Sequence, residues 1–476
     1  MSELPVAQVL ERVDANLDGS VERLFDLLRI PSVSTDPAFA DDVQRAARWM
    51  ADELAGLGFE AAVRPTTGHP MVVAHHPGPG GAKGGDAPHL LYYGHYDVQP
   101  ADPLELWDSG PFEPVLVDAE RGKRIVARGA VDDKGQVMTW VEAFRAWRDV
   151  HGSLPCRITV LLEGEEECGS PSLDPFIAAN AGELKADACI VCDTGMWDVD
   201  QPAITYSLRG LVYQEVTVRG PSRDLHSGMY GGVVVNPLNL LARILGELHD
   251  ADGRVQIPQF YDDVVPVGAN EKAQWEALGY DEKEAMEDIG LVSADGGEKG
   301  YSAIERQWAR PTCDVNGILG GYVGDGAKTV IAREAMAKIS CRLVPDQDPH
   351  AVSANLKKFI TDRLPDGYTA TFVDLDSGGS PAIRVPTDSP YLNAARQGLA
   401  EVFGKEAYLI GTGGSIPAVG SIRKYLGIDS ILLGFGLEDD RVHSPNEKFE
   451  LVCFHNGIRS NAAVLARMAE IVKRKG

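Results

Sequence analysis

Short apolar runs recur along the first part of this chain, and each of them ends at an acid or a histidine. The clearest three are residues 90–93 before His95, residues 158–162 before Glu163, and residues 188–192 before Asp193. Uninterrupted apolar runs of this length are typical of strands that are buried on both faces, as in a parallel sheet. Because ligands bind at the carboxyl ends of such strands, we expect these polar residues to share one cleft.

An amphipathic helix lies between two of these strands. Val137, Trp140, Val141, Phe144 and Trp147 fall at i, i+3, i+4, i+7 and i+10, which places them on one helix face. The alternation of strand and helix over residues 40–193 predicts an α/β layer with a mostly parallel central sheet. Similar patterns predict helices at 1–28, 41–57, 237–248, 349–364, 391–403 and 449–473, and strands at 59–64, 71–75, 211–218, 337–343 and 430–434.

At 476 residues the chain is longer than one hydrophobic core usually covers, so two domains are expected. The strands predicted after residue 210 alternate apolar and polar residues, and helices follow them, which predicts a small α+β domain with an open-faced sheet. The α/β pattern then resumes. We expect residues 1–209 and 385–476 to form the α/β domain, residues 210–384 to form an inserted lid, and the acidic stretch 251–310 to be an insertion within that lid.

Composition argues against several classes of partner. A net charge of -25 disfavours binding to nucleic acid or to an anionic membrane surface. No apolar run approaches the ~20 residues of a membrane span, and the first 28 residues lack the pattern of a secretory signal. Cys189 and Cys192 have CxxC spacing, but they lie inside a strand-like run and no second CxxC follows. We therefore expect a reduced, cytoplasmic protein.

The acids and histidines suit a metal site, although each motif also has a plainer explanation. Imidazole nitrogen and carboxylate oxygen are ligands for zinc or manganese. A lone histidine such as His95 is more often structural, one acid of the pair Asp132 and Asp133 would cap the following helix, and the glutamates between 163 and 167 have the composition of a solvated turn. Adjacent acids repel each other unless a cation compensates. The motifs together favour one metal centre built from separated segments.

The motifs GHYDVQP, GAVDDKG, LLEGEEECGS and DDRVHSPNE are long, ordered and specific. Taken together they resemble the M20 family of metallopeptidases, and most of all its carnosinase-type cytosolic non-specific dipeptidases. The resemblance runs from residue 31 to residue 446. It implies a zinc-peptidase-like α/β domain and a ferredoxin-like lid through which two copies form a homodimer. It further implies hydrolysis of dipeptides with two divalent ions, Zn²⁺ or Mn²⁺, per subunit.

The same resemblance implies a metal-binding role for five residues. Asp132 would bridge the two ions, while the remaining ligands would be His95 and Asp193 for one ion and Glu167 and His443 for the other. The peptide bond between Asp132 and Asp133 is cis in such enzymes.

Catalytic roles are also implied by the resemblance. Glu166 would be the general base, and Asp97 would be the partner of His95. His226, in the lid sequence LHSG, would polarise the scissile carbonyl across the dimer.

Substrate recognition is expected to involve the lid. By resemblance Arg342 would bind the C-terminal carboxylate, with further contacts from Thr329, Gly414 and Ser415. The alternating strand 337–343 independently places Arg342 on its polar face, where an arginine can grip a carboxylate or form a surface ion pair.

Two residues depart from the family pattern. Ala332 replaces a common proline, which is expected to alter the carboxylate end of the pocket, and Cys168 replaces a frequent serine conservatively. Two other functions remain open from the sequence: an amidohydrolase that releases an acyl group from N-acyl amino acids, and a non-catalytic metal- or peptide-binding protein. The presence of Glu166 beside a full ligand set argues against the second.

Overall fold

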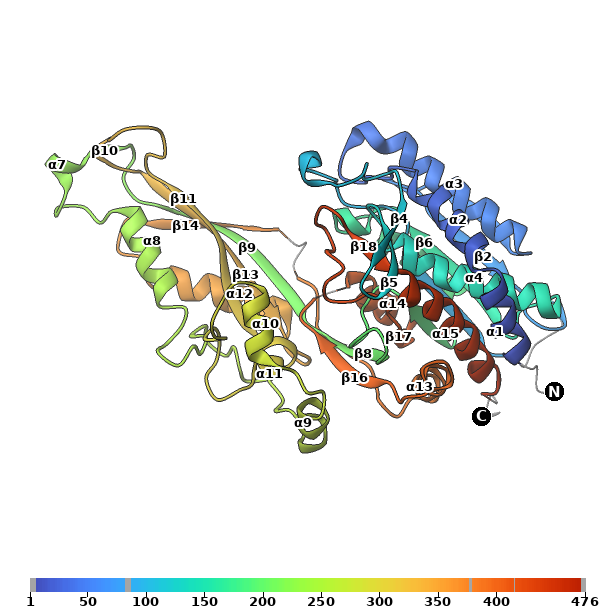
Figure 1. Ribbon diagram of the computed structural model, residues 1–476. Helices are drawn as coiled ribbons and strands as arrows, with labels where there is room; N and C mark the ends of the chain where they lie inside the picture. Colours follow the sequence, from blue (N-terminus) through green and yellow to red (C-terminus); the bar gives the residue numbers. More distant parts are fainter. Residues whose placement is uncertain (1–5, 82–86, 376–378, 415, 472–476) are drawn as a thin grey trace. The chain divides into compact units, whose positions relative to one another are not determined.

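The computed structural model describes residues 6–81, 87–375, 379–414 and 416–471. The chain divides into two compact units, whose elements are labelled in Figure 1. Unit 1 comprises Met1–Tyr206, Val385–Ile410 and Pro417–Gly476, and unit 2 comprises Ser207–Arg384 and Gly411–Ile416. The short segment Gly411–Ile416 thus belongs to unit 2, whereas the sequence placed it with the returning α/β segment.

The central sheet, most of which lies in unit 1, has the strand order β1-β2-β6-β3-β7-β17-β8-β15, where β15 is Ile383–Arg384. The other strands are β1 (Glu60–Arg64), β2 (Met71–His76), β3 (His89–His95), β6 (Arg157–Glu163), β7 (Ala188–Val191), β8 (Ala203–Leu208) and β17 (Ser430–Leu432), and β16 (Tyr408–Thr412) also pairs with β8. Strands β6, β3, β7 and β17 are mutually parallel, while β1, β2 and β8 pair antiparallel with their neighbours. The predicted α/β layer is confirmed, with its parallel pairing at the buried centre.

The helices of unit 1 are α1 (Val6–Ala15), α2 (Leu17–Leu28), α3 (Ala40–Gly56), α4 (Lys134–His151), α5 (Leu173–Ala179), α6 (Ala181–Leu184), α13 (Pro390–Phe403), α14 (Pro417–Leu426) and α15 (Leu451–Ala469). Helix α4 carries the predicted apolar stripe and packs against α1, α2 and α15, as Figure 1 shows. The single helix predicted for residues 1–28 is instead two helices, α1 and α2, separated at Asn16. Residues 1–5 of that prediction lie outside the described residues.

A small antiparallel sheet in unit 1 was not predicted. Its strands, in the order β18-β5-β4, are β4 (Val115–Ala119), β5 (Gly122–Val126) and β18 (Lys448–Glu450). Phe449 of β18 pairs with Ile125 of β5. This pairing brings the segment that precedes α4 next to the segment that precedes α15, although they are far apart in sequence. The closing helix therefore begins at Leu451 rather than at residue 449.

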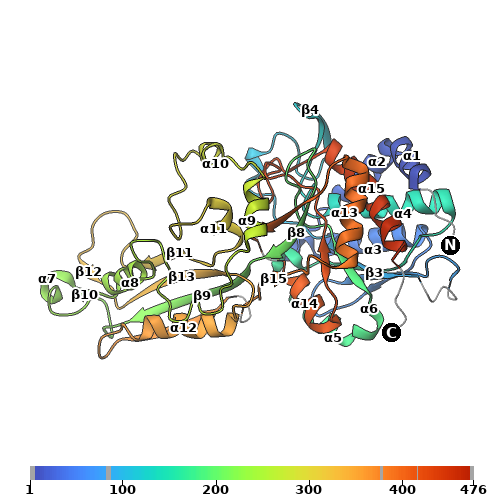
Figure 2. The same ribbon diagram turned by 90° about the horizontal axis from the view of Figure 1, so that it is seen from below.

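Unit 2 is built on a four-stranded antiparallel sheet in the order β11-β13-β9-β14. Its strands are β9 (Gly210–Arg219), β11 (Thr312–Gly320), β13 (Glu334–Leu343) and β14 (Thr369–Asp374), and a separate pair is formed by β10 (Leu225–His226) and β12 (Val330–Ile331). Helices α8 (Pro237–Gly246) and α12 (Pro349–Thr361) cover one face, and Figure 2 shows α12 running along β9.

Period-two alternation in β9 and β13 explains why only one face of this sheet is covered. Ala337, Ile339, Cys341 and Leu343 are buried against the helices, while the residues between them lie on the open face. The stretch 251–310, expected to be irregular, contains three short helices: α9 (Ala269–Glu276), α10 (Glu282–Asp288) and α11 (Ala303–Trp308). Within the residues described, no helix combines the length and apolar character needed to cross a membrane.

Candidate metal centre

The five candidate ligands come from five separate segments of unit 1. His95 ends β3, Asp132 precedes α4, Glu167 lies in the short 3₁₀ helix Glu166–Cys168, Asp193 follows β7, and His443 lies in the loop before β18. Strands β3, β6 and β7 are parallel neighbours, so the residues at their carboxyl ends meet at the same edge of the sheet. The β5–β18 pairing brings the other two segments together.

The donor atoms of these residues form two overlapping groups. In one group His95, Asp132 and Asp193, and in the other Asp132, Glu167 and His443, each offer one atom within 4.8 Å of the others. Asp132 belongs to both groups. Its Oδ1 lies 3.2 Å from His95 Nε2, and its Oδ2 lies 2.9 Å from His443 Nε2. Because the two oxygens face different histidines, this carboxylate has the geometry of a bridge between two cations.

The ring of His95 is held from its far side. Its Nδ1 lies 3.1 Å from the carbonyl oxygen of Asp97 and 3.3 Å from Asp97 Oδ1. The Asp97 carboxylate also accepts a hydrogen bond from the backbone N–H of Glu167, at 3.1 Å. Such contacts on the outer nitrogen orient a histidine whose other nitrogen binds metal. Asp97 therefore links the two ligand groups from behind.

The helix-cap explanation of the acid pair is not what the structure has. Asp133 is the N-cap residue of α4, but its side chain makes no capping hydrogen bond. Its Oδ2 instead accepts from the backbone N–H of His95, at 3.2 Å. The Asp132–Asp133 peptide bond is cis, as the resemblance implied. Both acids are thus turned toward the end of β3 rather than toward the helix terminus.

The acidic run after β6 is not a solvated turn. Glu163 is fully buried and accepts a hydrogen bond from the Tyr93 hydroxyl. Glu165 is also buried and accepts from the backbone N–H groups of His69 at 2.7 Å and Ser172 at 3.0 Å. Burial raises the pKa of the Glu166 carboxyl to about 7, with its acidic neighbours adding to the shift. A carboxyl with a pKa near neutrality suits proton transfer at neutral pH.

Electrostatics of the site favour bound cations. Burial raises the pKa of Asp193 well above its usual range, and repulsion by Asp133 adds to the shift. Hydrogen bonds to Asp132 and Glu167 raise the pKa of His443 to about 10. A divalent cation in each ligand group would relieve this crowding of negative charge. The nitrogen and oxygen donors, three per group with one shared carboxylate, fit two such cations.

The remaining predicted residues lie in unit 2 and fall into two places. His226 ends β10, and the N–H of Ser227 donates to the carbonyl oxygen of Thr329 at 3.0 Å, so His226 and Thr329 are close neighbours. Arg342 lies at the other end of the sheet, on the open face of β13. The N–H of Gly414 donates to Thr412 Oγ1 at 3.3 Å. The predicted residue Ser415 lies outside the described residues.

The separation of these two places follows from the length of β13. Glu334, at the end of β13 nearest β12, is eight residue steps from Arg342. At ~3.3 Å per step this is about 26 Å, whereas a dipeptide spans only about 7 Å. One chain therefore cannot place Arg342 and the His226–Thr329 pair on the same dipeptide through this sheet.

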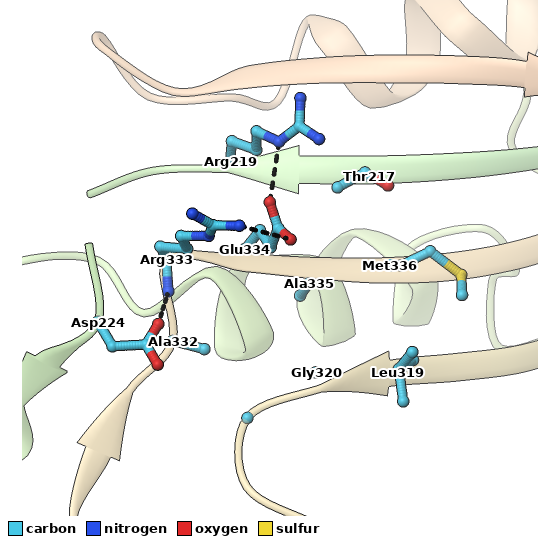
Figure 3. Close-up of a pocket in the computed structure, with 11 residues that line it drawn as sticks. Thr217, Arg219, Asp224, Leu319, Gly320, Ala332, Arg333, Glu334, Ala335 and Met336 are labelled. Carbon is cyan, nitrogen blue, oxygen red and sulfur yellow. Dashed lines mark hydrogen bonds and ion pairs between the residues drawn. The ribbon is translucent and has the colours of Figure 1, made fainter. Parts of the chain in front are cut away.

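A hollow of ≈ 430 Å³ also lies at the β12 end of unit 2 (Figure 3), and none of the predicted site residues lines it. Its charged side chains pair with one another, Arg219 with Glu334 at 2.9 Å and Arg333 with Glu334 at 3.6 Å, and the Asp224 carboxylate accepts from the backbone N–H of Arg333 at 3.0 Å. Ala332 lines this hollow, so the departure from the family proline lies at the end of the sheet opposite Arg342.

Two residues with informative contacts, Gln99 in unit 1 and Arg209 in unit 2, received no role from the sequence. Gln99 donates from Nε2 to Glu167 Oε2 at 2.8 Å, which fixes the carboxylate beside His443. Arg209 is the other. Its Nε donates to the carbonyl oxygen of Gly413 at 3.2 Å, and burial lowers its pKa to about 10, with a smaller contribution from the charge of Arg342. The motif that contains Gln99 was visible, but only the folded geometry shows which group it contacts.

Comparison with known proteins gives a consistent result. The sequence profile of Peptidase family M20/M25/M40 matches residues 91–467. The Cys-Gly metallodipeptidase dug1 of Schizosaccharomyces pombe is 31% identical, over 98% of this chain and 99% of its own length. The Beta-Ala-His dipeptidase of Homo sapiens is 30% identical, over 98% of this chain and 93% of its own length.

Solved structures show the same similarity. The di-peptidase Dug1p from Saccharomyces cerevisiae superposes with a TM-score of 0.82 at 28% identity, covering 99% of this chain and 100% of that one. Human carnosine dipeptidase 1 gives a TM-score of 0.80 at 27% identity, covering 98% of this chain and 99% of that one. The similarity therefore extends over both units.

Proposed function

The chain belongs to peptidase family M20/M25/M40, and we propose that it is a two-metal dipeptidase acting on dipeptides with a free C-terminal carboxylate. The observation that carries the proposal is the Asp132 carboxylate, shared between two ligand groups that Glu166 adjoins. The similar proteins named above, a Cys-Gly metallodipeptidase and a Beta-Ala-His dipeptidase, indicate the class of substrate.

Two divalent ions, Zn²⁺ or Mn²⁺, would be held in unit 1. His95 and Asp193 would hold one ion, Glu167 and His443 the other, and Asp132 both. When bound, such ions polarise the scissile carbonyl and make water a better nucleophile near neutral pH. Similar ligands accept several metals, so the ligand set alone does not select between zinc and manganese.

Glu166 is proposed as the general base. Its carboxyl, with a pKa of about 7, would take a proton from the attacking water and return it to the leaving amine. Asp97 is proposed as a positioning residue, because it contacts the outer nitrogen of His95 and the backbone of Glu167. Neither of these two contacts requires Asp97 to touch the substrate.

Arg342 is proposed to bind the C-terminal carboxylate of the dipeptide, together with Gly414 and Ser415. Support comes from its place on the open face of β13, where a guanidinium can bind a carboxylate through two hydrogen bonds. Thr329 is proposed as a further carboxylate contact.

The lid residues favour a homodimer. His226 and Thr329 lie together at the β12 end of unit 2, and β13 runs about 26 Å from Glu334 at that end to Arg342, so the pair would act on a dipeptide bound at another copy's Arg342. We propose that two copies associate through unit 2 and that His226 donates to the developing oxyanion in the partner's site. His226 is exposed, as a residue that acts on another subunit requires.

A cytoplasmic location is part of the proposal. It rests on the seven cysteines, all of which are free thiols, as is usual in a reducing compartment. Six of them are buried and Cys168 is exposed. The charge of -25 supports a small-molecule partner rather than a nucleic acid or a membrane surface.

The alternative hydrolase would release an acyl group from N-acyl amino acids with the same metals. The deciding experiment is hydrolysis of a dipeptide panel, including Cys-Gly and β-Ala-His, by metal-reconstituted protein, with N-acetylated dipeptides as controls. A dipeptidase cleaves the free forms and discriminates against the acetylated ones. Cleavage of only the acetylated forms would establish the amidohydrolase, and metal binding without turnover of either would indicate a binding protein.

A further inference from the structure

The carboxylate of Glu447 lies at the meeting point of three segments that carry candidate ligands. It is fully buried, as is its partner Arg128. Arg128 Nη1 donates to Glu447 Oε2 at 2.8 Å, and Arg128 Nη2 donates to the carbonyl oxygen of Pro100 at 3.0 Å. The pair therefore joins the loop that follows His95 to the loop that contains His443.

Glu447 also holds the backbone of the third segment. Its Oε1 accepts from the N–H groups of Val131 at 2.9 Å and Asp132 at 3.0 Å, and its Oε2 accepts from the N–H of Gly129 at 3.0 Å. With Arg128, each oxygen accepts two hydrogen bonds, which uses the full capacity of a carboxylate. The N–H of Asp132 itself is thus fixed by this group, only a few bonds from the proposed bridging oxygens.

The loop that carries His443 needs such an anchor. Arg441, His443 and Asn446 adopt left-handed backbone conformations with φ of 57°, 62° and 60°. Non-glycine residues hold such conformations only where the surrounding structure fixes them. Asn446 contributes by accepting from the Asp108 N–H at 2.8 Å and donating to the Leu106 carbonyl at 2.9 Å. Glu447, the next residue, ties the same loop to Asp132.

We propose that Glu447, paired with Arg128, is a positioning residue that sets the distance between Asp132 and His443 and so determines metal affinity. It touches neither metal nor substrate. Glutamine cannot replace it, because the amide would point an N–H₂ group at two hydrogen-bond donors. The inference rests on the proposed function only through the assignment of Asp132 and His443 as ligands.

The test measures Co²⁺ binding to the metal-free full-length protein, using calorimetry for the affinity and visible absorption for the geometry of bound Co²⁺. Glu447→Gln is expected to weaken Co²⁺ binding by about 10–100-fold, as loss of outer partners of metal ligands does. The absorption spectrum should also change, because the ligand geometry is altered.

Glu142→Gln is the matched control. Glu142 lies on α4, is 2% exposed, and accepts four hydrogen bonds, from Ser20, Arg145 and two nitrogens of Arg23. Its loss should destabilise the fold in a similar way without touching the ligand segments. Equal Co²⁺ affinity in wild type and Glu447→Gln, or equal weakening in Glu142→Gln, overturns the proposal.

If Glu447→Gln does not fold, Glu447→Asp decides the question. Aspartate keeps the charge but withdraws the carboxylate by one methylene, so weaker Co²⁺ binding supports the proposal and unchanged binding overturns it. The proposed function fails separately: a wild type that binds two Co²⁺ and cleaves no dipeptide rejects the dipeptidase while leaving this comparison of affinities intact.

Discussion

The two units assemble their candidate functional residues in opposite ways. In unit 1, five ligands from distant parts of the sequence converge until their donor atoms lie within 4.8 Å in each group. In unit 2, β13 runs about 26 Å from Glu334, at the end nearest β12, to Arg342 at the other end. Parallel strands gather side chains at one edge, whereas an antiparallel sheet spreads them along its length. The candidate ligands of unit 1 therefore meet within one chain, whereas Arg342 and the His226–Thr329 pair lie at opposite ends of unit 2, and only the proposed homodimer would bring both to one substrate.

Burial also differs between His95 of unit 1 and His226 of unit 2, while His443 of unit 1 is exposed. His95 is fully buried, and burial also raises the pKa of Glu166 to about 7, so the groups of unit 1 are adjusted by their surroundings. His226 is exposed on the outer strand pair of unit 2. The chemistry of unit 1 should therefore be sensitive to single-atom changes, and that of unit 2 to the presence of a partner.

The largest expected effect tests the base in unit 1. Glu166→Gln should lower kcat by ~10²–10⁴-fold, because the amide cannot accept the proton from water. Metal content, measured by plasma mass spectrometry, should stay at two ions per subunit. Glu60→Gln, on the exposed edge of β1, is the control. Near-normal turnover in metal-replete Glu166→Gln would remove this residue from the role.

The next effect tests whether unit 2 acts on another copy. His226→Ala should lower kcat by about 10²–10³-fold, which corresponds to an activation free energy raised by ~2.7–4 kcal/mol, and metal content should stay unchanged. Heterodimers of His226→Ala with Glu166→Gln have one site with both groups intact, so activity should rise to about half that of wild type. Verified heterodimers that stay as inactive as the parents would confine His226 to its own chain or exclude it.

Metal removal should separate the two units in stability. A ligand at 100 times its Kd stabilises a fold by about 2.7 kcal/mol per site. Chelation should therefore speed amide hydrogen exchange near the ends of β3 and β7 and in the loop 441–447, and leave β9 and β13 unchanged. Mass spectrometry of peptides from each unit measures this. Equal deprotection of both units would contradict a centre that is confined to unit 1.

The sequence predicted what depends on periodicity. The stripe from Val137 to Trp147 predicted α4, and alternation in residues 337–343 predicted the face on which Arg342 lies. The short strands β4, β5 and β18 were missed because three to five residues show no clear period, and β18 also pairs with a strand more than 300 residues away in sequence. The break between α1 and α2 at Asn16 was missed because the amphipathic pattern of residues 1–28 continues through it.

Candidate ligands could be selected from the sequence, but their arrangement could not. Asp132 follows no periodic pattern, and its shared position came from resemblance rather than from spacing. Glu447 stood inside a recognised motif, yet its contacts with Gly129, Val131 and Asp132 depend on a buried meeting of loops. The sequence around a buried carboxylate indicates that it needs hydrogen-bond donors. It does not indicate which donors, because those come from segments far away in the sequence.

The smallest expected effect tests recognition by the open face of unit 2. If Arg342 binds the C-terminal carboxylate, Arg342→Ala should raise KM for free dipeptides roughly 10–150-fold. This corresponds to a loss of about 1.5–3 kcal/mol of binding free energy, the usual contribution of a hydrogen bond to a charged group. Wild type should cleave C-terminally amidated dipeptides poorly, and the variant should show a smaller difference between the free and amidated forms. Lys338→Ala is the matched control, since it removes a cation from the same face of β13 about 13 Å away. Steady-state kinetics on both forms measures the effect, and equal hydrolysis of both by wild type would mean that unit 2 does not read the carboxylate. A large fall in kcat with unchanged KM would instead place Arg342 with the groups that act in the transition state, and the division of roles between the units would have to be redrawn.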